Sequence, residues 1–248
     1  MKDIKKEVEP ILLAGKIMTE SGSEIYRIED TMRRMALNTN LGECHSYVTM
    51  TGVFISFSEP PYTLFLTAYN RTTDLSKVVQ VNSISRLLQE KKLNDNQLLS
   101  SLQEIDRKKE NYPFILRLFA AGVVSGCLMI IFGGFWQDYI STFVIGMMGY
   151  GVSQWLIKRI NVNYFNYFGA SVVIGVMALV MQKLGWLHNI ENIIVGSLMP
   201  LVPGVAITNA FRDLLSGHLI GGLARGVEAI IIAGSIGSGI AMVLMLWR

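Results

Sequence analysis

The stretch "PLVPGVAITNAFRDLLSGHL" (residues 200–219) interrupts a long apolar region with two prolines, two glycines and a neighbouring pair of opposite charges. Pro200 and Pro203 each remove a backbone donor, and Gly204 gives the chain conformational freedom beside them. A helix break at membrane depth leaves backbone polar groups that need protein, water or a solute as partners. Transporters use such breaks to present helix ends to substrates and ions, whereas other bundles use them as kinks. The stretch therefore predicts a broken membrane helix, with either a transport or a purely structural role.

The composition divides the 248-residue chain near residue 112. Residues 1–110 carry 15 Lys/Arg and 15 Asp/Glu, whereas residues 111–248 carry 7 and 4. This shift predicts a small soluble domain over 1–112 and a transmembrane domain over 113–248. The net charge is only +3 and the basic residues form no single patch, which argues against a nucleic-acid partner.

The second half contains five apolar stretches, each about as long as the ~20 residues that cross a ~30 Å hydrocarbon core. They predict spans near 114–132, 137–157, 164–183, 191–210 and 224–246. Gly and Ser recur inside these stretches, and small residues of this kind favour close helix packing in lipid. Because Lys and Arg concentrate in the loop after the second span and just before the first, we expect the N-terminal domain in the cytoplasm.

The first half changes from helical to alternating periodicity and back. Apolar spacing predicts helices over 6–20, 23–38, 74–90 and 95–110, and strands over 44–58 and 62–69 with a turn at Glu59–Pro61. Ser21-Gly-Ser-Glu24 has the form of a capping box for the second helix. The predicted fold class is an α-helical polytopic membrane protein, with one of about five spans broken, preceded by a small cytoplasmic α+β domain.

The sequence contains few motifs that would indicate catalysis, metal binding or cofactor binding. Cys44 and Cys127 lack metal-ligand spacing, and no nucleotide-binding phosphate loop occurs. A membrane-bound hydrolase remains an alternative because the soluble half holds polar residues suited to catalysis: Glu24, Cys44, His45, Ser46 and Glu59. However, neighbouring strand residues point to opposite faces, and neither G-x-S-x-G nor H-E-x-x-H is present. We therefore expect a protein that is not an enzyme, with no cofactor and no metal.

The charges that follow the break are costly within a membrane unless they are paired or functional. Asp213 could pair with Arg225, or it could line an aqueous cavity and carry a proton. In the second case Arg212 or Arg225 could hold a solute carboxylate, whereas His218 is more typical of polar surface. Hydropathy leaves open whether residues 211–223 form a cytoplasmic loop, a surface helix or a re-entrant hairpin.

Two motifs at opposite ends of the chain resemble the threonine/serine exporter family. One is "PLVPGVAITNAFRDLLSGHLIGGLARGVEA" (residues 200–229), with N-x-x-R-D, S-G and G-x-A-R-x-x-E-A, and the other is S-G-x-E-x-Y-R at residues 21–27. The resemblance implies a cytoplasmic N-terminal domain and five spans. It also implies candidate residues for the substrate or ion pathway: Pro203, Gly204, Asn209, Arg212, Asp213, Arg225 and Glu228. Glu24, Tyr26 and Arg27 match the N-terminal motif.

Full-length members of that family continue with further spans, so the chain resembles the N-terminal half of a split form. Split proteins of this kind have been associated with dicarboxylate (succinate) export. The resemblance thus predicts a proton-coupled secondary exporter of small carboxylate-bearing metabolites in the bacterial cytoplasmic membrane. Partners would be the small-molecule substrate, the lipid bilayer and a separate small membrane subunit or further copies of the chain. The alternative is a membrane-anchored sensory, regulatory or hydrolase-like protein whose cytoplasmic domain carries the activity.

Overall fold

The computed structural model describes residues 2–39, 44–58, 61–69, 71–108, 112–160, 162 and 164–247. The chain forms two compact units. The first comprises Met1–Glu110 and Gly204–Val227, and the second comprises Asn111–Pro203 and Glu228–Arg248. The unit that holds the predicted soluble domain therefore also includes a segment from the predicted membrane half.

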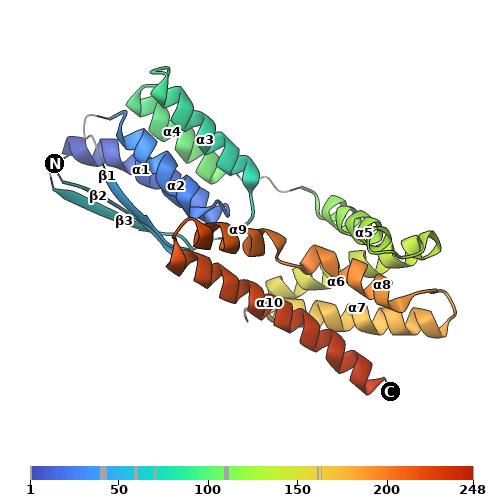
Figure 1. Ribbon diagram of the computed structural model, residues 1–248. Helices are drawn as coiled ribbons and strands as arrows, with labels where there is room; N and C mark the ends of the chain where they lie inside the picture. The colour runs from blue at the N-terminus through green and yellow to red at the C-terminus, as the bar shows by residue number, and fades with distance from the viewer. Residues whose placement is uncertain are drawn as a thin grey trace. The chain divides into compact units, whose positions relative to one another are not determined.

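The first unit combines helices with one small antiparallel sheet (Figure 1). Its elements are α1 (Lys2–Glu20), α2 (Ile25–Ala36), β1 (Cys44–Val48), β2 (Gly52–Phe57), β3 (Tyr62–Thr67), α3 (Leu75–Gln89), α4 (Asp95–Arg107), α9 (Gly204–Leu215) and the start of α10 (Leu219–Leu246). The sheet has the order β1-β2-β3, so β1 and β3 are its edges. In Figure 1 the strands lie on one side of α1 and α2, and α3 and α4 lie on the other.

The prediction of one strand over 44–58 is wrong, because a turn divides this segment into β1 and β2. The turn closes through the Thr49 N–H, which donates to the Gly52 carbonyl at 2.8 Å. Gly52 also lacks a side chain where the ring of Phe65 passes, since a Cβ there would lie 2.4 Å from Cε2 of that ring. The apolar alternation shifts by one residue at the turn, from Val48 and Met50 to Val53 and Ile55, and this shift of phase is the sequence signal of the turn.

The core of the first unit is built around α1. One face of this helix is fully buried against α2, α3 and the inner face of the sheet: Val8, Ile11, Ala14, Ile17 and Met18. Each such aliphatic side chain contributes about 1.5–3 kcal/mol on burial. Gly15 allows the closest approach, because a Cβ there would lie 2.5 Å from Sδ of Met32 and 2.9 Å from Cγ1 of Val53. The helix is thus fixed against both α2 and β2.

The second unit is an apolar helical bundle (Figure 1). It contains α5 (Phe114–Ile131), the 3-10 turn η1 (Trp136–Asp138), α6 (Tyr139–Arg159), α7 (Phe165–Lys183), α8 (Ile190–Leu198), the 3-10 turn η2 (Met199–Leu201) and the rest of α10. Four helices of the described chain are long and apolar enough to cross a membrane, and a fifth span results if Ile190–Leu201 and Gly204–Leu215 count as one. These findings agree with the predicted fold class of about five spans, one of them broken.

Small residues bring the helices of the bundle together, as expected for packing in lipid. A Cβ on Gly146 would lie 2.0 Å from Oγ of Ser125, and one on Gly196 would lie 2.5 Å from Cβ of Met129. Ser125 satisfies its hydroxyl within its own helix by donating to the Ala121 carbonyl at 2.8 Å. Gly146 and Gly196 therefore serve as packing surface, whereas a Cβ on Gly234 or Gly237 would meet no described atom within 4 Å.

The helix break lies between η2 and α9. Val202 is extended (φ −68°, ψ 130°), and α9 begins at Gly204 directly after Pro203. Residues 211–223 do not form an extended loop, because α9 continues to Leu215 and α10 begins at Leu219 rather than at residue 224. Gly217, with φ of +87°, turns the chain between them, and the His218 N–H closes the turn by donating to the Asp213 carbonyl at 2.8 Å. The segment is a tight helical hairpin.

Candidate functional site: a polar junction between two motifs

The two sequence motifs from opposite ends of the chain meet within the first unit. The turn between α1 and α2 contacts α9 and the first part of α10. Asn209 donates from Nδ2 to the Gly22 carbonyl at 2.8 Å, and Arg225 donates from Nη2 to the Ser23 carbonyl at 2.6 Å. We refer to these contacting residues and the charged residues paired with them as the polar junction: Gly22, Ser23, Glu24, Ile25, Arg27, Asn209, Arg212, Asp213 and Arg225. It fixes the α9–α10 hairpin to the N-terminal motif.

Asp213 lies at the centre of the polar junction and is fully buried. Its Oδ1 accepts a hydrogen bond from the Ile25 N–H at 2.8 Å, and its Oδ2 lies 3.3 Å from Nε of Arg225. The predicted pairing of Asp213 with Arg225 is therefore confirmed. Since Ile25 is the first residue of α2, the carboxylate also faces the positive end of that helix dipole.

The predicted capping box at Ser21–Glu24 is wrong. Glu24 occupies the N-cap position of α2, but no side chain of its own segment caps the helix there. Asp213 supplies the acceptor instead, from a position far along the sequence. A local pattern cannot reveal such a cap, because the acceptor arrives only when α9 packs against the turn.

Glu24 is the second buried carboxylate of the polar junction, with 5% of the residue exposed. It forms ion pairs with Arg212 and with Arg27, the latter at 3.3 Å. Both arginine side chains remain partly open to solvent, at 62% and 43% exposure. Tyr26, the other residue of the N-terminal motif, is exposed. The junction thus has a buried anionic centre and an accessible cationic rim.

Glu29 and His218 extend this arrangement along α2. Oε1 of Glu29 accepts a hydrogen bond from the Val48 N–H at 3.2 Å, and Oε2 lies 3.9 Å from Nδ1 of His218. Burial raises the pKa of Glu29 above its ordinary value, and the nearby carboxylate of Asp213 raises it further. His218 and the Val48 N–H act in the opposite direction without cancelling the effect of burial.

The raised pKa of Glu29 predicts a pH dependence of stability. A carboxyl whose pKa is higher in the folded state binds its proton more tightly there, so its stabilising contribution is lost as pH rises. We expect the free energy of unfolding of the wild type to fall, relative to Glu29→Gln, as pH rises from 4.5, the ordinary pKa of a glutamate, through the raised pKa of Glu29. Chemical unfolding of both proteins across this pH range would measure the difference. Parallel pH profiles would contradict the prediction.

The remaining predicted residues are Pro203, Gly204 and Glu228. Pro203 ends the break and Gly204 begins α9. Glu228 belongs to the second unit, where its Oε1 accepts a hydrogen bond from the Tyr164 hydroxyl at 3.5 Å. Within the first unit, the structure therefore groups Asn209, Arg212, Asp213 and Arg225 with Glu24 and Arg27.

The described residues considered for hydrolysis show no catalytic grouping. Cys44 packs against the core of the first unit, whereas His45 is exposed on the other face of β1. Glu24 is engaged by two arginines, and Glu59 lies outside the described residues. Within the described part of the chain, no three His, Cys, Asp or Glu side chains are grouped so that they could hold a metal ion.

Sequence reasoning missed the backbone and packing partners of the junction. The carbonyls of Gly22 and Ser23 and the N–H of Ile25 carry no sequence signal of their own. Gly221 also contributes, because a Cβ there would lie 1.9 Å from Cδ1 of Ile25. The glycine-rich start of the otherwise apolar helix α10 was the sequence signal for this close approach.

A buried carboxylate also organises the start of α8 in the second unit, as Asp213 does for α2 in the first. Asp138 accepts hydrogen bonds from the His188 and Asn189 N–H groups at 3.0 and 3.2 Å.

Comparison with known proteins identifies relatives along nearly the whole chain. The family model described as "Putative threonine/serine exporter" matches residues 9–247. The "Probable threonine/serine exporter" of Mycobacterium tuberculosis is 22% identical over 97% of this chain and 46% of its own length. The "Threonine/serine exporter" of Corynebacterium glutamicum is 20% identical over 94% of this chain and 49% of its own length. The chain thus spans about half the length of these two relatives.

A second kind of relative matches this chain along nearly its own whole length. The "Probable succinate transporter subunit YjjP" of Klebsiella aerogenes is 22% identical over 93% of this chain and 90% of its own length. No solved structure shows significant similarity to the chain. Together with the two motifs that meet in the polar junction, the match over residues 9–247 shows that the chain belongs to the threonine/serine exporter family.

Proposed function

We propose that the chain is a subunit of a secondary exporter for small carboxylate-bearing solutes, either amino acids of the threonine/serine type or a dicarboxylate such as succinate. The names of its relatives support both solute classes. The observation that carries the proposal is the buried Asp213–Arg225 pair in the hairpin that follows the helix break. Buried ion pairs of this kind suit a transporter because their charge state can be linked to a change in packing.

Asp213 is the first candidate for proton coupling. Its carboxylate simultaneously caps α2 and pairs with Arg225, so protonation would weaken two contacts of the polar junction at once. Loss of the negative charge would remove the attraction between the Asp213 carboxylate and the buried Arg225 guanidinium, which favours release of the hairpin from the turn. Glu228, with its hydrogen bond from Tyr164, is the second candidate carrier.

The accessible cations of the junction are the candidates for binding the solute carboxylate. Arg212 keeps 62% of its side chain exposed while it contacts Glu24, whereas Arg225 is buried. Arginine presents paired donors that match a carboxylate, so Arg212 and Arg27 would bind the solute at the rim. Solute binding there would compete with Glu24 for the same guanidinium groups, which links solute occupancy to the integrity of the junction.

We also place the subunit in the bacterial cytoplasmic membrane with its N-terminus in the cytoplasm. The distribution of Lys and Arg among the short loops supports this orientation. A second small membrane subunit, further copies of the chain, or both would complete the transporter. The designation of the Klebsiella relative as a transporter subunit supports a partner.

Uptake into inside-out membrane vesicles tests the proposal, because export appears there as uptake. Labelled threonine, serine and succinate would be supplied with and without the candidate partner, under imposed pH gradients. We expect gradient-dependent uptake of one solute class by the wild type and at least a tenfold loss in Asp213→Asn or Glu228→Gln, whichever residue carries the proton. Asp30→Asn, which alters a carboxylate on the exposed side of α2, is the matched control and should retain uptake.

Two results would refute parts of this proposal. Absence of uptake for all three solutes, with the partner present and the protein folded, would refute export of these carboxylates. Full uptake by both Asp213→Asn and Glu228→Gln would refute proton coupling through either carboxylate and would leave the junction with a structural role.

A further inference from the structure

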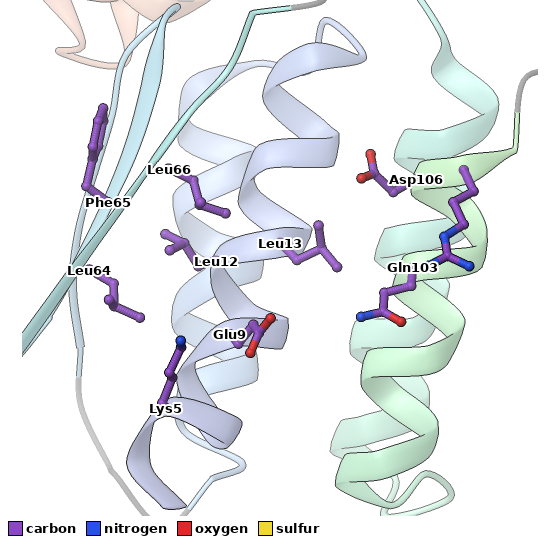
Figure 2. A pocket seen from close by; sticks show the side chains of 10 residues that line it. Lys5, Glu9, Leu12, Leu13, Leu64, Phe65, Leu66, Gln103 and Asp106 are labelled. Carbon is purple, nitrogen blue, oxygen red and sulfur yellow. The ribbon is translucent and has the colours of Figure 1, made fainter. Parts of the chain in front are cut away.

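A groove of about 440 Å³ opens in the first unit, away from the polar junction (Figure 2). Lys5, Glu9, Leu12 and Leu13 of α1 line it together with residues 64–66 of β3 and residues 103, 106 and 107 of α4. Its volume lies within the range of about 300–1,000 Å³ that is usual for small-molecule sites. Leucine side chains form its apolar part, and polar side chains from two helices converge on it.

The polar lining has charges of both signs that lack a partner among the described residues. In the described part of the chain, the side chains of Lys5, Glu9, Gln103 and Arg107 form no hydrogen bond or ion pair with another residue. Asp106 differs, since its Oδ2 lies 3.3 Å from Nζ of Lys16. Beside its apolar wall, the groove therefore contains two cationic side chains, Lys5 and Arg107, and one carboxylate, Glu9, that lack a partner among the described residues.

This charge pattern distinguishes between classes of ligand. A dicarboxylate would satisfy Lys5 and Arg107 but would bring a second anion towards Glu9. An uncharged apolar molecule would leave all three charged groups without partners. A molecule with one carboxylate, one ammonium group and an apolar side chain complements the whole lining.

The neighbouring strand edge suggests a peptide as another occupant, because β3 is an edge strand. A peptide added as a fourth strand would extend along Tyr62–Thr67, whereas the groove borders only residues 64–66 of this strand. Because the groove borders only three residues of β3, it fits a small ligand better than a peptide added as a fourth strand.

We infer that the groove between α1, β3 and α4 binds a small zwitterion, an α-amino acid with an apolar side chain. Its carboxylate lies between Lys5 and Arg107, its ammonium group faces Glu9, and its side chain packs against Leu12, Leu64 and Leu66. The site lies beside the N-terminal half of α1, whereas the polar junction begins after the C-terminal end of the same helix. It is therefore a second site, separate from the residues proposed for solute transport.

Binding to the full-length protein in detergent tests this inference without requiring transport. Equilibrium dialysis would compare radiolabelled leucine, radiolabelled succinate and N-acetyl-leucine amide, which keeps the side chain but lacks both charges. We expect leucine to bind best, with a dissociation constant raised at least tenfold by Lys5→Ala, Glu9→Gln or Arg107→Ala. Lys6→Ala and Glu90→Gln make the same charge changes at exposed positions outside the groove and should bind as the wild type does.

Hydrogen exchange locates the bound ligand on the chain. Leucine should slow exchange of amides in residues 5–13, 62–67 and 103–107, and Asp213→Asn should leave this protection unchanged. The inference is overturned if leucine does not bind, if N-acetyl-leucine amide or succinate binds equally well, or if protection appears only elsewhere. Because these readouts do not depend on export, a vesicle experiment without uptake would refute the proposed function and leave this site standing.

Discussion

Replacement of Arg225 by methionine should lower the free energy of unfolding of the first unit by about 3–5 kcal/mol. Only 6% of Arg225 is exposed, and its guanidinium both donates to the Ser23 carbonyl and lies 3.3 Å from the Asp213 carboxylate. Methionine fills a similar volume but leaves a fully buried carboxylate without its counter-ion and a carbonyl without its donor. Denaturant unfolding followed by far-UV circular dichroism, with hydrogen exchange of the amides at the start of α2, would measure the loss.

A double variant and a surface variant make this prediction specific to the buried pair. Asp213→Asn combined with Arg225→Met removes both charges, so its cost should be smaller than the sum of the two single costs. Arg34→Met breaks the exposed i,i+4 pair with Asp30 and should cost at most about 1 kcal/mol. If Arg225→Met costs no more than Arg34→Met, the buried pair does not stabilise the junction.

The membrane spans were predictable from sequence because hydropathy is a property of each segment by itself. Stretches of about twenty apolar residues identify spans without knowledge of their neighbours. The pairing of Asp213 with Arg225 was also predictable, since a strongly apolar segment offers few partners for a buried carboxylate. The apolar alternation correctly indicated strands, and its change of phase between Met50 and Val53 marks the turn that the prediction of one strand lacked.

The cap of α2 shows what local sequence could not provide. Ser21–Glu24 fits a capping box, yet the Ile25 N–H is satisfied by Asp213, 188 residues further along the chain. Such a partner becomes available only through tertiary packing. Asp213 caps the helix in place of a local side chain because a buried carboxylate at a helix N-terminus gains both a hydrogen bond and the interaction with the helix dipole. The association of Glu24 with Arg212 depends on the same packing. Each of the two motifs was recognisable alone, but their meeting was visible only in the structure.

Gly222→Ala should destabilise the α9–α10 hairpin by about 1–3 kcal/mol, although alanine is the better helix former. A Cβ at this position would lie 2.9 Å from the backbone N of Leu214 and 3.0 Å from the Ala210 carbonyl oxygen. Backbone atoms cannot rotate away as a flexible side chain can, so the two helices would have to separate. Separation would also withdraw Asp213 from the Ile25 N–H, which extends the damage to the start of α2.

Gly226→Ala, one helical turn along α10, is the matched control. Its added Cβ would lie 4.0 Å from Cβ of Ala210, an ordinary contact distance, so the helix propensity of alanine should stabilise the protein by up to about 1 kcal/mol. Hydrogen exchange of the His218 and Ile25 amides should accelerate in Gly222→Ala and remain unchanged or slow in Gly226→Ala. Equal acceleration in both variants would mean that helix contact at Gly222 does not hold the hairpin. Faster exchange of the His218 amide alone would show that the hairpin can open without releasing Asp213, which would contradict the coupling between hairpin and turn on which the proposed role of Asp213 depends.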